Sequence, residues 1–282
     1  MKLVTKLITG QVPTIDAPDL QTFQREYAAK NQPVILTGAI PTWEALGKWD
    51  LPFLRTALGK TPLRVYVSSD GAFRAHPELG FHESLWKTLT GADYIDWVAN
   101  GPRPPHLLLQ HQSLLTKFPQ LGPDIRVPIY VDSARVRDVN LWIGAGDNVT
   151  PLHCDQADNL LIQIIGEKRL FLASPAQRTN LYPFGPLNRI PPITSRVNLG
   201  APDLQQFPRL KKAKFFEATL RPGEMIFLPV HWWHEVHGMG TNVSVNFWWE
   251  ASNRNVWRYP NYMLSIYAHN LWRVTRARLG RA

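Results

Sequence analysis

The pattern of apolar and polar positions divides the chain into a mixed α/β opening and a longer β-rich part. Leu20, Phe23 and Tyr27 recur at helical spacing, and Pro33 ends that pattern. A buried strand is expected directly afterwards, over residues 34–36. The other elements expected in this part are a helix over 51–58, a strand over 63–69 and two helical pieces within 82–98, separated near Gly91.

Short β-rich runs separated by Gly, Pro and Asn begin near Leu107 and predict an antiparallel sandwich or barrel. A proline-rich stretch over 174–213 interrupts them, and we expect an ordered lid or insert because it is too long for a turn. The expected strands are 139–145, 158–165, 168–173, 215–220, 224–228, 234–237 and 241–249.

These patterns predict a mainly β (α+β) protein with a single domain over 1–282. Its parts are an N-terminal α/β elaboration over 1–106, a β core over 107–250 that carries the insert, and a C-terminal helical segment over 251–282. In the helical segment one apolar face is formed by Tyr262, Ile266, Asn270 and Val274, with Met263, Tyr267 and Leu271 beside it.

Composition is that of an ordinary globular protein, with 44% hydrophobic and 19% charged residues. No stretch approaches the roughly 20 apolar residues of a membrane span, and we expect no membrane partner. The apolar run at the N-terminus is short for a signal peptide. Because Cys154 is the only cysteine, an internal disulfide is excluded, and a cytoplasmic location is expected.

The formal charge of +9 and a pI near 9.8 favour an acidic partner such as nucleic acid, an anionic surface or an acidic peptide. The alternative is an arginine-rich protein without such a partner. The basic side chains gather at the C-terminal end, where no acidic residue follows Glu250. The arginines there are Arg254, Arg258, Arg273, Arg276, Arg278 and Arg281.

The candidate chemistry begins with His153 and Asp155. Residues two apart in a strand point to the same side, so this imidazole and this carboxylate can reach one metal ion. The pair suits Fe(II), Mn(II) or Zn(II), and ligand type alone does not choose among them.

A third ligand is expected after the turn and buried strand at 222–229. The candidates are His231, His234 and His237, and the preceding Trp pair favours His234. The other two histidines are then interpreted as structural. Two histidines and one carboxylate form the facial triad of non-haem Fe(II) oxygenases, which leaves neighbouring metal positions open.

Several segments, in matching order and spacing, resemble the JmjC or cupin-like 2-oxoglutarate oxygenases, including the asparaginyl hydroxylase branch and bacterial cupin-like relatives. The similarity spans roughly residues 33–250. It is carried by the segments 33–38, 141–155, 166–169, 228–234 and 245–248 with Trp43, Trp49 and Asn159. The resemblance implies a double-stranded β-helix, or jelly roll, and a catalytic iron held by His153, Asp155 and His234.

The resemblance also implies roles around the iron. Lys168 would pair with the distal carboxylate of 2-oxoglutarate and Thr150 would donate a hydrogen bond to it, whereas a solvated strand-end lysine is the alternative. Asn159 and Asn246 would line the cosubstrate pocket, with structural hydrogen bonds as the competing interpretation. The residues expected at the substrate pocket are Trp142, Trp248 and Gln110.

One departure concerns Leu108, which stands where relatives close to the asparaginyl hydroxylase have a cosubstrate-binding tyrosine. Gln110, His111 and Tyr130 are the candidate replacements, unless Lys168 and Thr150 alone hold the carboxylate.

The activity implied is hydroxylation of a protein or peptide side chain with Fe(II), 2-oxoglutarate and O2, releasing succinate and CO2. The alternatives are hydroxylation of RNA or a modified nucleotide, which the basic charge favours, and a non-catalytic metal-binding sensor. N-methyl demethylation is the same chemistry on another carbon. Related hydroxylases dimerise through terminal helices, and the apolar face of the C-terminal segment predicts the same here, with packing onto the chain's own core as the alternative.

Overall fold

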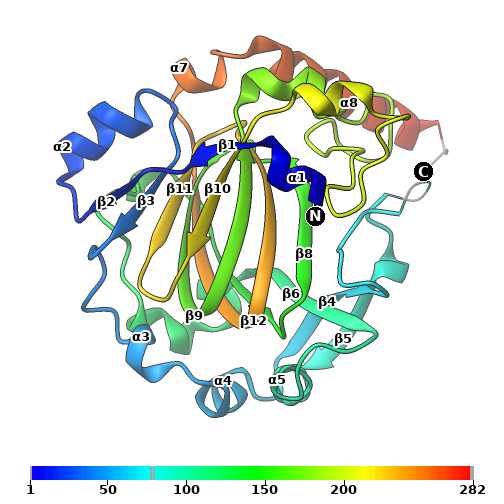
Figure 1. The fold of residues 1–282 in the computed structure, drawn as a ribbon. Helices are drawn as coiled ribbons and strands as arrows, with labels where there is room; N and C mark the ends of the chain where they lie inside the picture. The colour runs from blue at the N-terminus through cyan, green and yellow to red at the C-terminus, as the bar shows by residue number, and fades with distance from the viewer. Residues whose placement is uncertain (1, 77, 79, 280–282) are drawn as a thin grey trace.

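A computed structural model describes residues 2–76, 78 and 80–279, except for the side chains of residues 2–4 and 111. Twelve strands form one hydrogen-bonded network. At its centre β9 (Asp158–Ala173) and β12 (Trp233–Trp249) pair antiparallel along their length. Figure 1 shows these two strands in the middle of the molecule, flanked by shorter ones.

The two long strands pass through both layers of a jelly roll. The first half of β9 pairs with β11 (Met225–Leu228) and its second half with β10 (Phe215–Leu220). The first half of β12 pairs with β8 (Asn148–Cys154) and its second half with β7 (Val136–Gly144). One layer therefore has the order β1-β10-β9-β12-β8 and the other β2-β3-β11-β9-β12-β7-β6-β4-β5. This arrangement confirms the double-stranded β-helix.

Glycines permit the bends in the long strands. Gly166 has φ +69°, and a Cβ there would collide with the carbonyl oxygen of Thr241. The pairing register shifts at the same place, between Met239 and Val243. A side chain at residue 166 is therefore excluded by both backbone conformation and space.

The remaining strands lie mostly toward the N-terminus. They are β1 (Ile8–Gln11), β2 (Thr14–Asp16), β3 (Val34–Thr37), β4 (Pro62–Ser68), β5 (Trp86–Thr90) and β6 (His106–Ser113). The α-helices are α1 (Lys2–Leu7), α2 (Leu20–Phe23), α3 (Ala45–Lys48), α4 (Leu51–Leu58), α5 (Gly91–Ala99), α6 (Leu114–Lys117), α7 (Asn253–Val256) and α8 (Pro260–Arg278). Short π or 3-10 helices cover Gln24–Ala28, Glu83–Leu85, Pro119–Asp124, Ser133–Arg135, Pro175–Asn180 and Pro208–Lys212.

Helices cover opposite ends of the strands, with α3 to α5 at the lower edge and α7 and α8 at the upper edge of Figure 1. Tyr94 of α5 is fully buried, and its hydroxyl donates to the Ile143 carbonyl at 2.6 Å. On the other side the Trp233 indole donates to the Tyr262 hydroxyl of α8 at 2.6 Å, and that hydroxyl donates to the Pro175 carbonyl at 2.9 Å. The start of α8 is thus fixed to the core and to the insert. None of the helices in the described ranges combines the length and apolar character of a membrane crossing.

Most elements expected from the sequence are confirmed, but a few expectations are wrong. The stretch 86–90 is a strand and not a helix, because it pairs with β4 and its Trp86 ring stacks on Tyr66 at 4.7 Å. The expected strand pairs 158–165 with 168–173 and 234–237 with 241–249 are each one bent strand.

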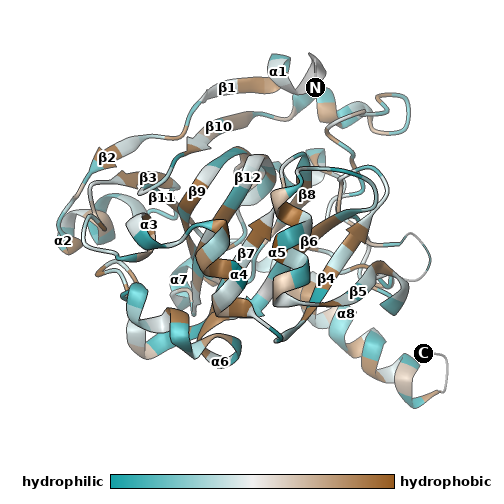
Figure 2. Ribbon diagram, turned by 90° about the horizontal axis from the view of Figure 1, so that it is seen from below, coloured by the Kyte–Doolittle hydropathy of each residue, from teal (hydrophilic) through white to brown (hydrophobic). Residues whose placement is uncertain are grey.

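The expected helical face in the C-terminal segment is also wrong in part. Tyr262 and Ile266 are buried on the core, but the third buried position is His269. Val274 is exposed, and so is Asn270. The end of α8 projects from the body of the molecule in Figure 2, which explains why the buried face does not continue along the helix.

Candidate metal centre

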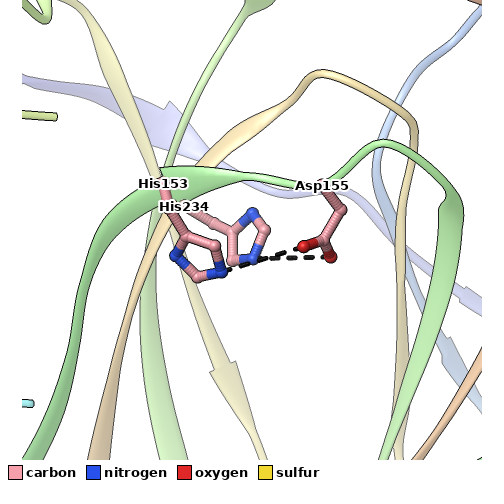
Figure 3. A group of neighbouring side chains, drawn as sticks. All are labelled: His153, Asp155 and His234. Atoms are coloured by element: carbon pink, nitrogen blue, oxygen red, sulfur yellow. Dashed lines mark ion pairs between the residues drawn. The ribbon is translucent and has the colours of Figure 1, made fainter. Parts of the chain in front are cut away.

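Two paired strands bring the three expected ligands together. His153 lies near the end of β8, Asp155 follows that strand directly, and His234 is the second residue of β12. His153 and His234 are direct partners in the antiparallel pairing, so their rings lie side by side with centroids 4.3 Å apart. One donor atom from each of the three residues lies within 4.8 Å of the others. Figure 3 shows both imidazoles and the carboxylate facing a common point.

Backbone carbonyls determine which nitrogen of each imidazole faces that point. The Nδ1 atom of His153 lies 2.8 Å from the Pro151 carbonyl oxygen, and that of His234 lies 3.0 Å from the Trp232 carbonyl oxygen. Because a carbonyl only accepts, each Nδ1 carries the proton and each Nε2 keeps its lone pair. The two Nε2 atoms lie 3.8 and 3.9 Å from Asp155 oxygens. This is the tautomer that a metal requires.

Neutral imidazole is favoured further by burial. His234 is 3% exposed, and burial lowers its pKa to about 4, with the neighbouring His153 adding to the effect. At neutral pH this imidazole is therefore uncharged, which is the state that can bind a metal ion.

A chain of side-chain amides and indoles orients the carboxylate. The Asn159 amide donates to Asp155 Oδ2 at 3.0 Å, and the Trp248 indole donates to the same oxygen at 3.3 Å. The Asn159 carbonyl oxygen accepts from the Asn246 amide at 3.0 Å, and Asn246 accepts from the Trp142 indole at 2.7 Å. Hydrogen-bonded partners of this kind hold metal ligands in position.

The two other histidines of the segment lie outside the triad. His231 is 1% exposed, stacks on Tyr262 at 4.5 Å, and donates its backbone N–H to the Asp155 carbonyl at 3.1 Å. His237 lies 2.8 Å from Glu235. Neither contributes a donor atom to the group formed by His153, Asp155 and His234.

A deep pocket extends from the triad to Lys168. Its lining includes Thr150, Asn159, Asn246, Trp142 and Trp248 in addition to the three candidate ligands. Lys168 is 5% exposed and donates a hydrogen bond to Ser244, and no carboxylate pairs with it among the described residues. Burial lowers the pKa of Lys168 to about 7. A buried lysine without a counter-charge fits a site that receives an anion, and it does not fit the alternative of a solvated lysine.

The structure excludes one of the three candidate replacements for the missing cosubstrate-binding tyrosine. Leu108 lines the deep pocket, at the position where the resemblance expects a cosubstrate-binding tyrosine. Tyr130 is excluded, because it packs on Phe23 at 5.0 Å and donates to the Pro18 carbonyl in the core. The His111 side chain lies outside the described part, and Gln110 lines a second, outer pocket.

Two residues at the deep pocket were not predicted from the sequence, namely Ser244 and Asn148. Ser244 is fully buried beside Lys168, and Asn148 lines the deep pocket. Ser244 stands two residues before Asn246 on the same strand, so the strand period would have placed both on one side.

Comparison with known proteins agrees with this geometry. A family profile described as a cupin-like domain matches residues 20–255. Jumonji C domain-containing protein 5 of Drosophila melanogaster is 31% identical over 245 residues, which cover 85% of this chain and 60% of that protein. The human bifunctional peptidase and (3S)-lysyl hydroxylase JMJD7 is 30% identical over 269 residues, which cover 85% of this chain and 84% of that protein.

A more distant relative is tRNA wybutosine-synthesizing protein 5 of Danio rerio, which is 26% identical over 257 residues, covering 85% of this chain and 75% of that protein. The chain spans less than two thirds of the Drosophila relative, whose remaining length has no counterpart in the match. The profile covers most of the chain, and the relatives match across the triad region. The protein therefore belongs to the cupin-like JmjC family.

Proposed function

We propose that the protein is an Fe(II)- and 2-oxoglutarate-dependent oxygenase that hydroxylates a side chain of a protein or peptide. One observation carries this proposal: the His153, Asp155 and His234 triad and the buried Lys168 line the same pocket. A metal-binding sensor has no evident need for a buried cation beyond its ligands. The name of the human relative, a lysyl hydroxylase, supports a protein substrate.

The residues present fit the proposed cofactors. Two neutral imidazoles and one oriented carboxylate are a suitable ligand set for Fe(II). Lys168, with Ser244 beside it, would hold the distal carboxylate of 2-oxoglutarate, and Thr150 would donate a hydrogen bond to it from the pocket wall. When bound, Fe(II) with 2-oxoglutarate and O2 supplies the oxidising power for hydroxylation and releases succinate and CO2.

The protein's own contribution is positioning. Asn159 and Trp248 fix the carboxylate of Asp155, and Asn246 and Trp142 in turn hold Asn159. Apolar walls from Leu108, Leu161, Leu228 and Val236 limit the access of water to the pocket.

Succinate formation tests this proposal. The purified protein with Fe(II), 2-oxoglutarate and O2 is expected to form succinate slowly without a substrate, and Asp155→Ala is expected to abolish it. Asp203→Ala is the matched control, because that carboxylate is exposed and lines neither pocket. Equal succinate formation by wild type and Asp155→Ala contradicts the proposal.

We also propose that α8 mediates a homodimer. Its outward face carries Leu264, Tyr267, Leu271 and Val274 at helical spacing, and these side chains are 49–70% exposed. Leu271→Glu is expected to convert a dimer to a monomer in light scattering, while the fold is preserved because this side chain lies off the core. A wild-type protein that is monomeric at micromolar concentration contradicts the proposal.

A further inference from the structure

A second pocket of about 550 Å³ opens on the outer side of the metal triad. It shares Thr150, His153, Asp155 and Trp248 with the deep pocket, so two of the candidate ligands, His153 and Asp155, lie at the boundary between the two. If the deep pocket holds the cosubstrate, the outer pocket is where a primary substrate approaches the metal. Aromatic side chains from several segments form its walls, namely Tyr66, Phe73, Phe81, Phe184 and Trp248.

The charged side chains of this outer pocket are nearly all positive. Arg74, Arg137 and Arg196 line it, whereas Asp155, the proposed metal ligand, is the only carboxylate among the described lining residues.

Carboxylates outside the lining partner two of the three arginines, so Arg196 is the one described lining arginine whose charge is not offset. Arg74 pairs with Asp70 at 2.8 Å, and Arg137 lies 3.5 Å from Glu250. Arg196 rests over the Phe207 ring at 5.5 Å and has no ion-pair partner in the part of the chain that the structure describes. A cation held on an aromatic ring and not neutralised by a carboxylate remains available to an anion.

Two of these arginines are positioned by β8, the strand that carries His153. The edge of β8 that is not paired with β12 receives two short segments. Phe73 donates its N–H to the Val149 carbonyl at 2.9 Å, and Ser195 donates to the Leu152 carbonyl at 2.9 Å. Arg74 and Arg196 each follow directly after these anchored residues. They are therefore fixed along the strand that ends at the metal site.

We infer that the outer pocket selects an uncharged or acidic side chain within an acidic peptide segment, and rejects lysine and arginine as the residue to be hydroxylated. This inference rests on the proposed oxygenase function and names its substrate class. A lysyl ammonium, the target in the name of the human relative, finds no free carboxylate among the described lining residues and meets like charges instead. Carboxylates that flank the target residue complement the arginines and favour encounter.

Peptide libraries test the inference. Two synthetic libraries share the same set of central residues, and one has Asp and Glu in the flanking positions where the other has Lys and Arg. Mass spectrometry is expected to show at least tenfold more oxygen incorporation in the acidic library, with no product at central lysine or arginine. Arg196→Glu is expected to lower turnover of the acidic library about tenfold. Arg126→Glu, an exposed arginine that lines neither pocket, is expected to leave it unchanged.

The inference is overturned if the basic library is turned over as well as or better than the acidic library, or if neither library is turned over. Better turnover of an RNA oligonucleotide than of the acidic library also overturns it. Succinate formed without peptide reports the oxygenase function independently. If no succinate forms, fluorescence anisotropy of labelled acidic and basic peptides still measures selectivity, and equal affinities overturn the inference on their own.

Discussion

Lys168→Met is expected to stabilise the protein while removing its affinity for 2-oxoglutarate. Burial lowers the pKa of Lys168 from 10.5 to about 7. Lowering the pKa by this amount on folding corresponds to about 4 kcal/mol of lost folding stability at pH 7. Methionine fills a similar volume without a charge, and the lost hydrogen bond to Ser244 costs about 1 kcal/mol. The expected net gain is therefore about 3 kcal/mol in the free energy of unfolding.

The lowered pKa of Lys168 also makes the folding stability of the wild type depend on pH. The unfolded chain keeps this lysine protonated to about pH 10.5, whereas the folded protein releases the proton near pH 7. Between these values the unfolded state binds more protons, so the stability of the wild type rises with pH. Lys168→Met lacks this pH dependence, so the difference in the free energy of unfolding between the variant and the wild type is expected to shrink between pH 7 and 10.

Urea unfolding with and without Fe(II) and 2-oxoglutarate, under anaerobic conditions, measures both effects. The wild type is expected to gain stability from 2-oxoglutarate and Lys168→Met is not, because the carboxylate loses its cation. Lys60→Met, at an exposed position, is the control and is expected to behave like the wild type. A variant that is less stable than the wild type, or that 2-oxoglutarate still stabilises, refutes the role of Lys168.

Three further predictions concern the residues around the candidate metal centre and the contact that fixes α8. Asn159→Ala removes one donor to Asp155, and it is expected to weaken Fe(II) binding by about 10- to 100-fold in calorimetry; an unchanged affinity shows that the amide chain does not orient the ligand. The affinity for 2-oxoglutarate is expected to fall about tenfold for each pH unit above 7, because the protonated form of Lys168 holds the carboxylate, and a flat profile from pH 7 to 9 contradicts this. Trp233→Phe deletes the buried hydrogen bond to Tyr262 and is expected to cost about 2 kcal/mol in urea unfolding, whereas an unchanged midpoint would show that this contact does not fix α8.

The sequence was sufficient to predict the triad because local rules apply to it. His153 and Asp155 are two apart on one strand, and the structure places them together with His234 as expected. The Trp pair before His234 favoured, among three histidines, the one that the structure places beside His153 and Asp155. In contrast, the strand over 86–90 depends on pairing with β4, and no local pattern predicts a non-local partner.

Other features required the fold itself. Gly166 and Gly240 indicate turns, but here they bend two continuous strands, because each strand changes partners in passing from one layer to the other. The burial of Lys168 and its contact with Ser244 arise only when β9 and β12 are paired. Arg74 and Arg196 likewise line the outer pocket only because two segments that are far apart in the sequence dock on β8.

Anaerobic titration of Fe(II) and 2-oxoglutarate, followed by visible absorption, tests the central claim most directly. Chelation of the keto acid to Fe(II) is expected to give a weak charge-transfer band in the wild type. His153→Ala is expected to abolish the band, and His82→Ala, an exposed histidine outside both pockets, to preserve it. A wild type that binds Fe(II) without forming the band would contradict the cosubstrate site and favour a metal-binding sensor.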